Sequence, residues 1–370
     1  MSKILRPIIF IVLLAFAGCT VGPEYSLPEA ATPANFSELT RGFSEPAEHW
    51  VKIYNDTELE KLVKKAREHN HDLAALYQRT LQSRAIIRSE SAQRRPQLNS
   101  GASYERFERT ESRRQLIVGE NGDGTLNSVR LEESTGKVKS DNYNARLDLG
   151  WEIDLFGRVS RLVEAAQLDS DAAEAAYQDL LLITETDVAV AYFRIRSLDR
   201  ELLAVARSVE TRRKSLDIVK KRFNSGAISD LDVAQAETVL AESEAELSFL
   251  KRERDILEHA LAVLTGQPAP DFSIVSKTLE GTPVAPPLAL PSELLQRRPD
   301  IRQSELELQT ANARIGVATA NFYPRISLNA NAGYAAMEAD KWFSNSAEFF
   351  GFGPQVSLPI FQGGRLRAEL

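Results

Sequence analysis

The sequence is poor in the residues from which most catalytic and metal sites are built. Its 370 residues include one cysteine, four histidines and two methionines. A single cysteine excludes an internal disulfide bond, and the cysteine and histidines show no zinc-binding spacing. A net charge of −7 without a sustained basic run argues against nucleic acid as the main partner, because phosphate binding needs clustered Lys and Arg. What is present, 43% hydrophobic and 26% charged residues, allows a buried core and more than one domain.

The N-terminus has the pattern of an export signal. Lys3 and Arg6 precede the apolar run Ile8–Phe16, which is too short to span a bilayer as a helix. The only cysteine, Cys19, follows at once in LLAFAGCT, which resembles a bacterial lipoprotein signal. In such proteins the cysteine becomes the acylated first residue. The resemblance therefore predicts lipidation at Cys19. Because Thr20 rather than Asp follows it, the analogy also predicts sorting to the outer membrane.

An internal repeat relates two parts of the chain. Residues 72–98 placed over residues 300–326 match at several landmarks, including Pro96 with Pro324. In each copy a helical stretch runs into this proline, which ends a helix because the preceding residue is pushed toward extended backbone. Pro96 and Pro324 are therefore predicted helix-to-strand junctions.

After each proline the hydrophobic period changes to two, and a second alternating stretch follows. This predicts two β-hairpins. A soluble antiparallel sheet with one wet face would alternate in the same way. We favour membrane strands because they are about ten residues long, have aromatic residues at interfacial positions and are joined by unequal connections. The interfacial candidates are Tyr104, Tyr143, Trp151, Tyr334, Trp342 and Phe361.

The stretch between about 108 and 141 is polar and Gly-rich, so we predict an extracellular loop there. Four strands cannot close a barrel and open edges are not tolerated in lipid, so several chains must share one barrel.

Two long stretches carry apolar residues in steps of four and three, the seam of a left-handed coiled coil. A helix beginning near Val159 would hold roughly 65 residues and span about 100 Å at 1.5 Å per residue. The first run is Leu181, Thr184, Val188, Ala191, Ile195, Leu198, Leu202, Val205, Val209, Arg212, Leu216, Val219 and Phe223. The second run is Val233, Ala236, Leu240, Ser243, Leu247, Leu250, Arg254, Leu257, Leu261 and Leu264.

The segment KRFNSGAISDLDVAQA separates the two runs. Gly226 suits a left-handed C-terminal cap, and Ser229 with Asp232 forms a capping-box pattern. We predict a helical hairpin with a tight tip, whose returning helix can stack end to end with a helix from about 58 to 94.

Three residue groups that could indicate an enzyme are weak. They are the triplet His69, Asn70 and His71, the glycines Gly351, Gly353, Gly363 and Gly364, and the acidic residues Asp148, Glu152 and Asp154. The triplet lacks the strand context and further ligands of a metal nuclease. The glycines favour tight turns over phosphate binding. The acidic residues, two apart on a strand, favour one row that faces a channel interior. We predict no enzyme and no cofactor.

Several motifs together resemble the TolC family of outer membrane efflux proteins, and most closely the NodT or OprM-like lipoproteins of RND-type efflux systems. They are CTVGPEY, RRPQL, FYPRISL, WEIDLFGR, LPIFQGGR, RFNSGAISDLDVAQAE and QRRPDI. The resemblance covers residues 19–370. It implies a fold that is mainly α with membrane β, in which long helical hairpins and four strands per chain build a trimeric β-barrel and α-barrel. It also implies a periplasmic adaptor and an inner membrane pump as partners.

Within this resemblance the residues acquire roles. The hairpin tip is the expected adaptor-docking surface, although spacing alone also fits a plain helix–turn–helix connection. Its residues are Asn224, Ser225, Gly226, Ala227, Ile228 and Ser229. Gly157, Gly363 and Gly364 lie at the strand-to-helix turns. The second copy ends shortly after Arg365, so the counterpart of the long hairpin is missing, and we expect a chain of this extent not to close its helical barrel.

The predicted segments follow the repeat. They are a signal peptide (1–18), an extended segment (19–57), helices of the first repeat (58–95), the first membrane hairpin (96–156), the long helical hairpin (157–265), a Pro-rich segment (266–298), the helix of the second repeat (299–323), the second membrane hairpin (324–362) and the start of a second long helix (363–370).

The function that this predicts is passive conduction of small molecules from periplasm to exterior in a tripartite efflux system. One alternative is the outer membrane component of a type I secretion system. Another, of a different class, is a periplasmic adaptor lipoprotein, which should flank one hairpin with soluble β domains.

Membrane fractionation separates the channel from the adaptor. We expect the chain in the outer membrane fraction, with heat-modifiable migration on gels because folded membrane barrels resist detergent. Recovery in the inner membrane fraction would contradict the channel interpretation.

Overall fold

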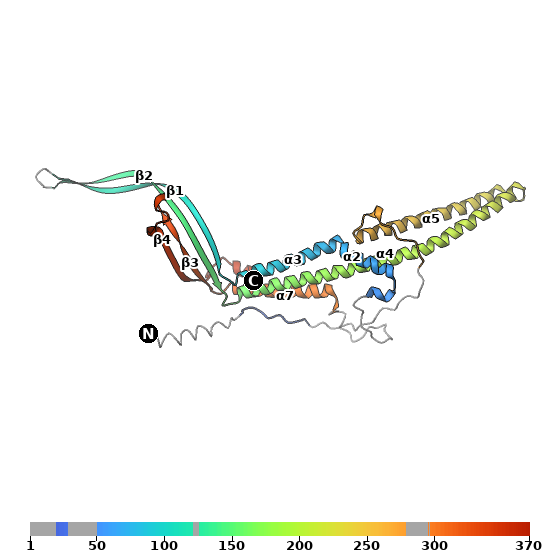
Figure 1. Cartoon of the computed structure of the whole chain (residues 1–370), viewed down its shortest axis with the longest axis horizontal. Coiled ribbons are helices and arrows are strands. Elements are labelled where there is room, and N and C mark those ends of the chain that lie inside the picture. Colours follow the sequence, from blue (N-terminus) through green and yellow to red (C-terminus); the bar gives the residue numbers. More distant parts are fainter. Residues whose placement is uncertain (1–19, 29–49, 121–125, 279–294, 296) are drawn as a thin grey trace. The chain divides into compact units, whose positions relative to one another are not determined.

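The computed structural model describes residues 20–28, 50–120, 126–278, 295 and 297–370 (Figure 1). The chain divides into two compact units, which are described separately. Unit 1 comprises Met1–Tyr25, Ile86–Ala166 and Thr310–Leu370, and unit 2 comprises Ser26–Ala85 and Gln167–Gln309.

Unit 1 contains a four-stranded antiparallel sheet. Its strands are β1 (Gln97–Glu120), β2 (Leu126–Ile153), β3 (Arg325–Ala336) and β4 (Glu348–Ser357), in the order β1-β2-β3-β4. The two hairpins expected from the repeat are both present, and β2 pairs with β3 to join them. The outer edges of the sheet are β1 and β4.

The predicted loop between about 108 and 141 is wrong. β1 and β2 stay paired through this stretch, with Arg109 opposite Val138 and Glu111 opposite Gly136, so the hairpin is a long ribbon (Figure 1). Cross-strand ion pairs line it, such as Glu108 with Lys137 at 2.8 Å. A two-stranded ribbon with water on both faces needs no hydrophobic alternation, because cross-strand charge pairs can stabilise it. Its polarity was therefore mistaken for that of a loop.

The sheet has two chemically different faces. Register places side chains of one row on the same face, because alternate residues of a strand point to opposite sides. One face carries the rows Leu98, Leu149, Ala330, Phe352 and Ser100, Leu147, Ala332, Phe350. The other face carries the rows Asn99, Asp148, Asn331, Gly351 and Gln97, Gly150, Asn329, Gly353.

Helices enter and leave the sheet at predicted positions. Pro96 lies between the end of α3 (His71–Ala92) and β1, and Pro324 lies between α7 (Pro299–Ala320) and β3. After β2 the chain turns into α4 (Arg158–Asn224), and after β4 into the short α8 (Arg365–Glu369). No helix among the described residues is long and apolar enough to cross a membrane.

Unit 2 is built on paired helices. α2 (Thr57–His69), α4 and α5 (Asp230–Leu264) pack around a core that includes Leu59, Ile195 and Leu261. The first part of α3 also belongs to this unit. The short turns η1 (Trp50–Tyr54) and η2 (Ala269–Asp271) flank them. Every position of both predicted heptad runs is buried or half-buried except Phe223 at the tip, which confirms the coiled-coil prediction.

α3 and α5 follow one another along α4 (Figure 1). Thr80 of α3 contacts the carbonyl of Ala173, and Lys220 of α4 pairs with Glu237 of α5 at 2.7 Å. The stretch predicted as one helix from about 58 to 94 is broken at Asn70. The side chain of Asn70 accepts hydrogen bonds from the N–H groups that begin α3 and donates to the carbonyl of Leu264 at 3.1 Å. Thus α3, rather than the whole stretch, continues the line of α5.

A buried charge network joins α4, α5 and the segment that follows η2. Asp199 accepts from Arg254 at 2.8 Å and pairs with Arg196 at 3.1 Å. It also accepts from the hydroxyl of Ser276 and the N–H of Lys277. Although burial of the carboxyl opposes it, these hydrogen bonds, led by that of Arg254, hold the pKa of Asp199 below its ordinary value.

We predict that Asp199→Asn lowers the free energy of unfolding by about 3–5 kcal/mol, because it leaves the buried guanidinium of Arg196 and the half-buried one of Arg254 without their shared carboxylate. Denaturant unfolding in detergent, followed by circular dichroism, measures this. Glu244→Gln is the matched control: the Arg213–Glu244 pair is 2.7 Å long but exposed, so its loss should cost less than about 1 kcal/mol. Equal effects of the two variants would contradict the role of the network.

The same carboxylate predicts an acid sensitivity. Because its pKa is depressed in the folded chain, Asp199 contributes stability above the pKa of an unfolded Asp and loses it as the pH falls through the depressed value. Unfolding scans from neutral pH downward should therefore show a steeper loss of stability in the wild type than in Asp199→Asn. Parallel curves would contradict this.

Candidate functional site

Aromatic side chains gather at one end of the sheet's short strands. Tyr104 and Tyr143 face each other across β1 and β2 with ring centroids 4.9 Å apart, and Tyr143 also contacts Trp342 at 5.4 Å. Trp342 stacks on Phe343, which reaches Tyr334 at 5.5 Å. Four of the predicted interfacial residues thus lie in one cluster. Phe343 was missed because it lies in the connection between β3 and β4.

A second aromatic level lies at the other end of the strands. The Trp151 indole donates to the carbonyl of Arg94 at 3.0 Å, and Phe156 stacks on Tyr323 at 4.9 Å. Phe361, beyond β4, is 88% exposed. From Tyr143 to Trp151, β2 covers roughly 26 Å at about 3.3 Å per residue. That matches the apolar band of about 25 Å between the aromatic girdles of membrane barrels.

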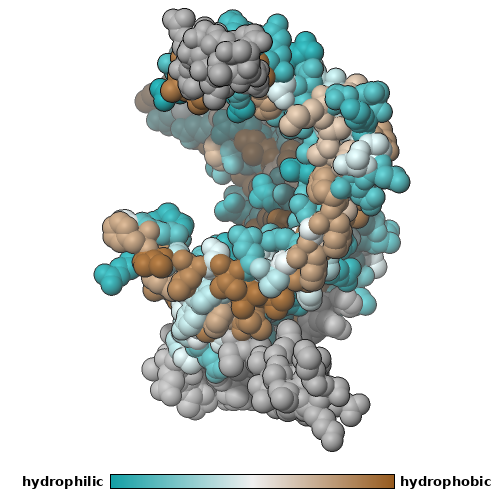
Figure 2. Space-filling view, turned by 90° about the vertical axis from the view of Figure 1, so that its left-hand side faces the viewer, coloured by the Kyte–Doolittle hydropathy of each residue, from teal (hydrophilic) through white to brown (hydrophobic). Residues whose placement is uncertain are grey.

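Between these levels one face of the sheet exposes large apolar side chains. They include Leu98 (65%), Phe350 (76%), Phe352 (65%) and Val356 (65%). Figure 2 shows hydrophobic side chains gathered into patches rather than scattered singly. Contiguous apolar surface of this kind marks contact with lipid or protein.

The opposite face is polar and carries mostly small side chains. Its rows consist largely of glycine and asparagine, with the ion pair Arg146–Asp148 at 3.0 Å. The predicted acidic row is only partly present on it. Glu152 forms a two-pronged pair with Arg158, and Asp154 accepts from the N–H groups of Val159 and Ser160 that begin α4. Both acids are engaged at the strand-to-helix turn, because a carboxylate at a helix N-terminus satisfies free N–H groups.

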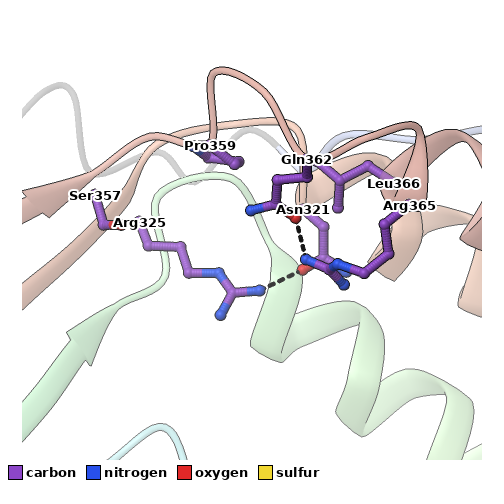
Figure 3. Close-up of a pocket in the computed structure, with 7 residues that line it drawn as sticks. All are labelled: Asn321, Arg325, Ser357, Pro359, Gln362, Arg365 and Leu366. Atoms are coloured by element: carbon purple, nitrogen blue, oxygen red, sulfur yellow. Dashed lines mark hydrogen bonds between the residues drawn. The ribbon is translucent and has the colours of Figure 1, made fainter.

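The predicted turn glycines lie at the strand-to-helix turns. Gly157 has φ +75°, and a Cβ there would also collide with Thr20. Gly363 and Gly364 have φ +57° and +89°. Beside them, Figure 3 shows a small pocket whose lining includes the side chains of Asn321, Arg325, Gln362 and Arg365. Arg325 donates to the Asn321 side chain at 2.7 Å, and Arg365 donates to that of Gln362.

Of the six predicted tip residues, Asn224 ends α4 and the other five form the connection to α5. Gly226 has φ +78°, the N–H of Ala227 reaches back to the carbonyl of Arg222 at 3.0 Å, and Ser229 with Asp232 forms the capping box. Hydrogen bonds from the N–H and hydroxyl of Ser229 lower the pKa of Asp232. All six residues are exposed except Ile228, which is half-buried.

Cys19 lies outside the described residues, but the segment that follows it is held in unit 1. Val21 donates to the carbonyl of Phe156 at 3.3 Å, and Asn312 donates to the carbonyl of Pro23 at 3.2 Å. Gly22 packs so closely on Gly316 of α7 that a Cβ would collide with its backbone. The residues after Cys19 are therefore seated beside the turn from β2 into α4.

The triplet His69–Asn70–His71 has a structural role at Asn70, which caps α3. Among the described residues there is no group of three or more His, Cys, Asp and Glu side chains that could hold a metal ion.

A two-faced strand sheet bounded by aromatic levels, joined to long heptad-paired helices, defines the class of outer membrane channels with helical hairpins. The family model "Outer membrane efflux protein" matches residues 62–267 and 290–370, and the chain belongs to this family. It is the outer membrane channel component of an RND-type tripartite efflux system, so neither the secretion nor the adaptor alternative is supported.

Individual relatives and a solved structure agree with this family membership. The solvent efflux pump outer membrane protein SrpC of Pseudomonas putida is 31% identical over 368 residues, which cover 97% of this chain and 74% of that protein. Nodulation protein T of Rhizobium leguminosarum bv. trifolii is 28% identical over 364 residues, 96% of this chain and 73% of that protein. The solved structure of the outer-membrane channel OprN matches with a TM-score of 0.78 and 29% identity, over 95% of this chain and 75% of that one.

We predict that Phe350→Lys blocks assembly in the outer membrane, because it puts a charge on the exposed apolar face. Such a charge costs about 2–4 kcal/mol near the bilayer midplane. Its neighbour Phe349 lies on the opposite face of the same strand, so Phe349→Lys is the matched control and should assemble. The yield of heat-modifiable protein in outer membranes measures both. Equal yields would contradict the assignment of the faces.

Proposed function

We propose that three copies of the chain share one closed β-barrel in the outer membrane, a duct through which small molecules pass passively to the exterior. The observation that carries this is the open four-stranded sheet with one apolar and one polar face. Strand edges cannot stay unpaired in hydrocarbon, so β1 of one copy needs β4 of the next. Four strands from each of three copies give twelve, with the polar face inside. A pump in the inner membrane supplies the energy.

The tip between α4 and α5 is our candidate surface for a periplasmic adaptor. Its backbone is fixed by the Gly226 cap and the Ser229–Asp232 capping box, while most of its side chains are exposed. A rigid, exposed helical turn loses little conformational entropy when it binds another helical hairpin. The names of the relatives, an efflux pump outer membrane protein among them, support a partnership of this kind.

The position of the residues that follow Cys19 supports a lipid anchor at this cysteine. Thr20 lies against Gly157, directly at the turn that follows β2. One residue spans 3.8 Å, so an acyl chain on Cys19 would start at the periplasmic end of the strands. The anchor and the strands would then enter the membrane at one level.

The trimer and duct are tested on the purified chain. We expect native mass spectrometry in detergent to give a mass of three chains, and planar bilayers to show stable conductance steps. Monomers without conductance would overturn the proposed function.

The docking surface has a matched pair of tests. Ser225 in the tip and Ser248 in α5 are both exposed, and each hydroxyl donates to a backbone carbonyl at 2.8–2.9 Å. We predict that Ser225→Asp weakens adaptor binding about tenfold or more, because a contact would strip water from the new charge, and that Ser248→Asp leaves it unchanged. Binding is measured by surface plasmon resonance with the purified adaptor. Equal affinities for the two variants would contradict docking at the tip.

A further inference from the structure

The polar face of the sheet carries little charge. From the row of Ser103 and Asn144 to the row of Gln97 and Gly150, its described side chains include two charged ones, Arg146 and Asp148. They are two residues apart on β2, so both point to this face, and the guanidinium Nε lies 3.0 Å from the carboxylate. The opposite charges therefore cancel at one place.

The surroundings keep this pair uncovered. Across the sheet from Asp148 lie Asn331 and Gly351, and a Cβ at Gly351 would collide with the amide oxygen of Asn331. Asn329 donates to Gln355 at 2.9 Å and lies near Gly150. The amide side chains of Asn329 and Asn331 thus lie along the polar face, over space that the neighbouring glycines leave free. The Arg146 and Asp148 side chains remain 56% and 42% exposed.

Stability does not account for the pair. An exposed ion pair contributes about 0–1 kcal/mol, and neither side chain fills a core. The other charges of this face lie outside these rows. Glu105 and the Arg109–Glu111 pair lie farther along β1, beyond the row of Ser103 and Asn144. At the end near the helices, Glu152 pairs with Arg158 and Arg325 bonds to Asn321. Arg146 and Asp148 therefore carry the charges at the centre of the polar face.

We propose that the Arg146–Asp148 pair sets the ion selectivity of the duct by cancelling its charge, so that solutes of either sign pass. This rests on the proposed function, in which the polar face lines a pore of three copies. Rings of uncompensated charge inside a pore attract one sign of ion and repel the other. Loss of Arg146 would leave three carboxylates in one ring, and loss of Asp148 would leave three guanidinium groups.

The test is the reversal potential of the full chain in planar bilayers under a KCl gradient. We expect the wild type to show a cation-to-anion permeability ratio near one. Arg146→Gln should shift the ratio several-fold toward K⁺, and Asp148→Asn several-fold toward Cl⁻. The double variant should return to the wild-type ratio, because it again has no net charge.

Arg106→Gln is the control. Arg106 forms the same kind of pair with Asp141, at 2.7 Å, but lies on the other face, next to Tyr104 and beyond the apolar rows. Its loss should leave the permeability ratio unchanged.

Two outcomes overturn the proposal in distinguishable ways. Conductance with one ratio in all variants would overturn the inference alone, as would an equal shift in Arg106→Gln. Absence of any conductance from the unsubstituted chain would overturn the proposed function and the inference with it.

Discussion

Every backbone N–H and C=O that crosses hydrocarbon must find a hydrogen-bond partner, and most of unit 1 follows from this. It explains why the strands pair without interruption in the order β1-β2-β3-β4, and why each hairpin is joined to the other through β2 and β3. In the proposed trimer, the two free edges, β1 and β4, are where neighbouring copies would meet. The alternation of side chains along the strands then assigns one face to lipid and the other to water.

The helices satisfy their backbone groups within themselves, so their packing is governed by side chains. The heptad seam supplies the general attraction between α4 and α5. Three polar exceptions within the seam have partners on the facing helix: Arg212 of the first run donates to Ser243 of the second. Arg254 of the second run donates to Asp199 of α4. Such pairs fix the register of two helices that apolar contacts alone would let slide. Precise register matters where Asn70 links the end of α5 to the start of α3.

Features that depend on local sequence were predictable, and features that depend on distant contacts were not. Pro96, Pro324 and the heptad runs act through their neighbours in the chain, so the junctions and the coiled coil could be predicted. The ribbon beyond Tyr104 was taken for a loop because a strand with water on both faces has no hydrophobic period. The Arg196–Asp199–Arg254 network joins residues far apart in sequence, and no local pattern reveals it. The two-residue spacing of Glu152 and Asp154 was recognised, but spacing alone does not reveal the partners that both acids find at the start of α4.

The docking of the N-terminal segment on unit 1 has a consequence for the order of events during biosynthesis. Pro23 is held by Asn312, which is made 289 residues later. At about 5–20 residues per second, translation of that interval takes roughly 15–60 s. Throughout this time Val21 to Pro23 have no surface to dock on, so an enzyme carrying out the proposed acylation of Cys19 would meet an unfolded peptide. Docking of this segment would then follow the proposed acylation.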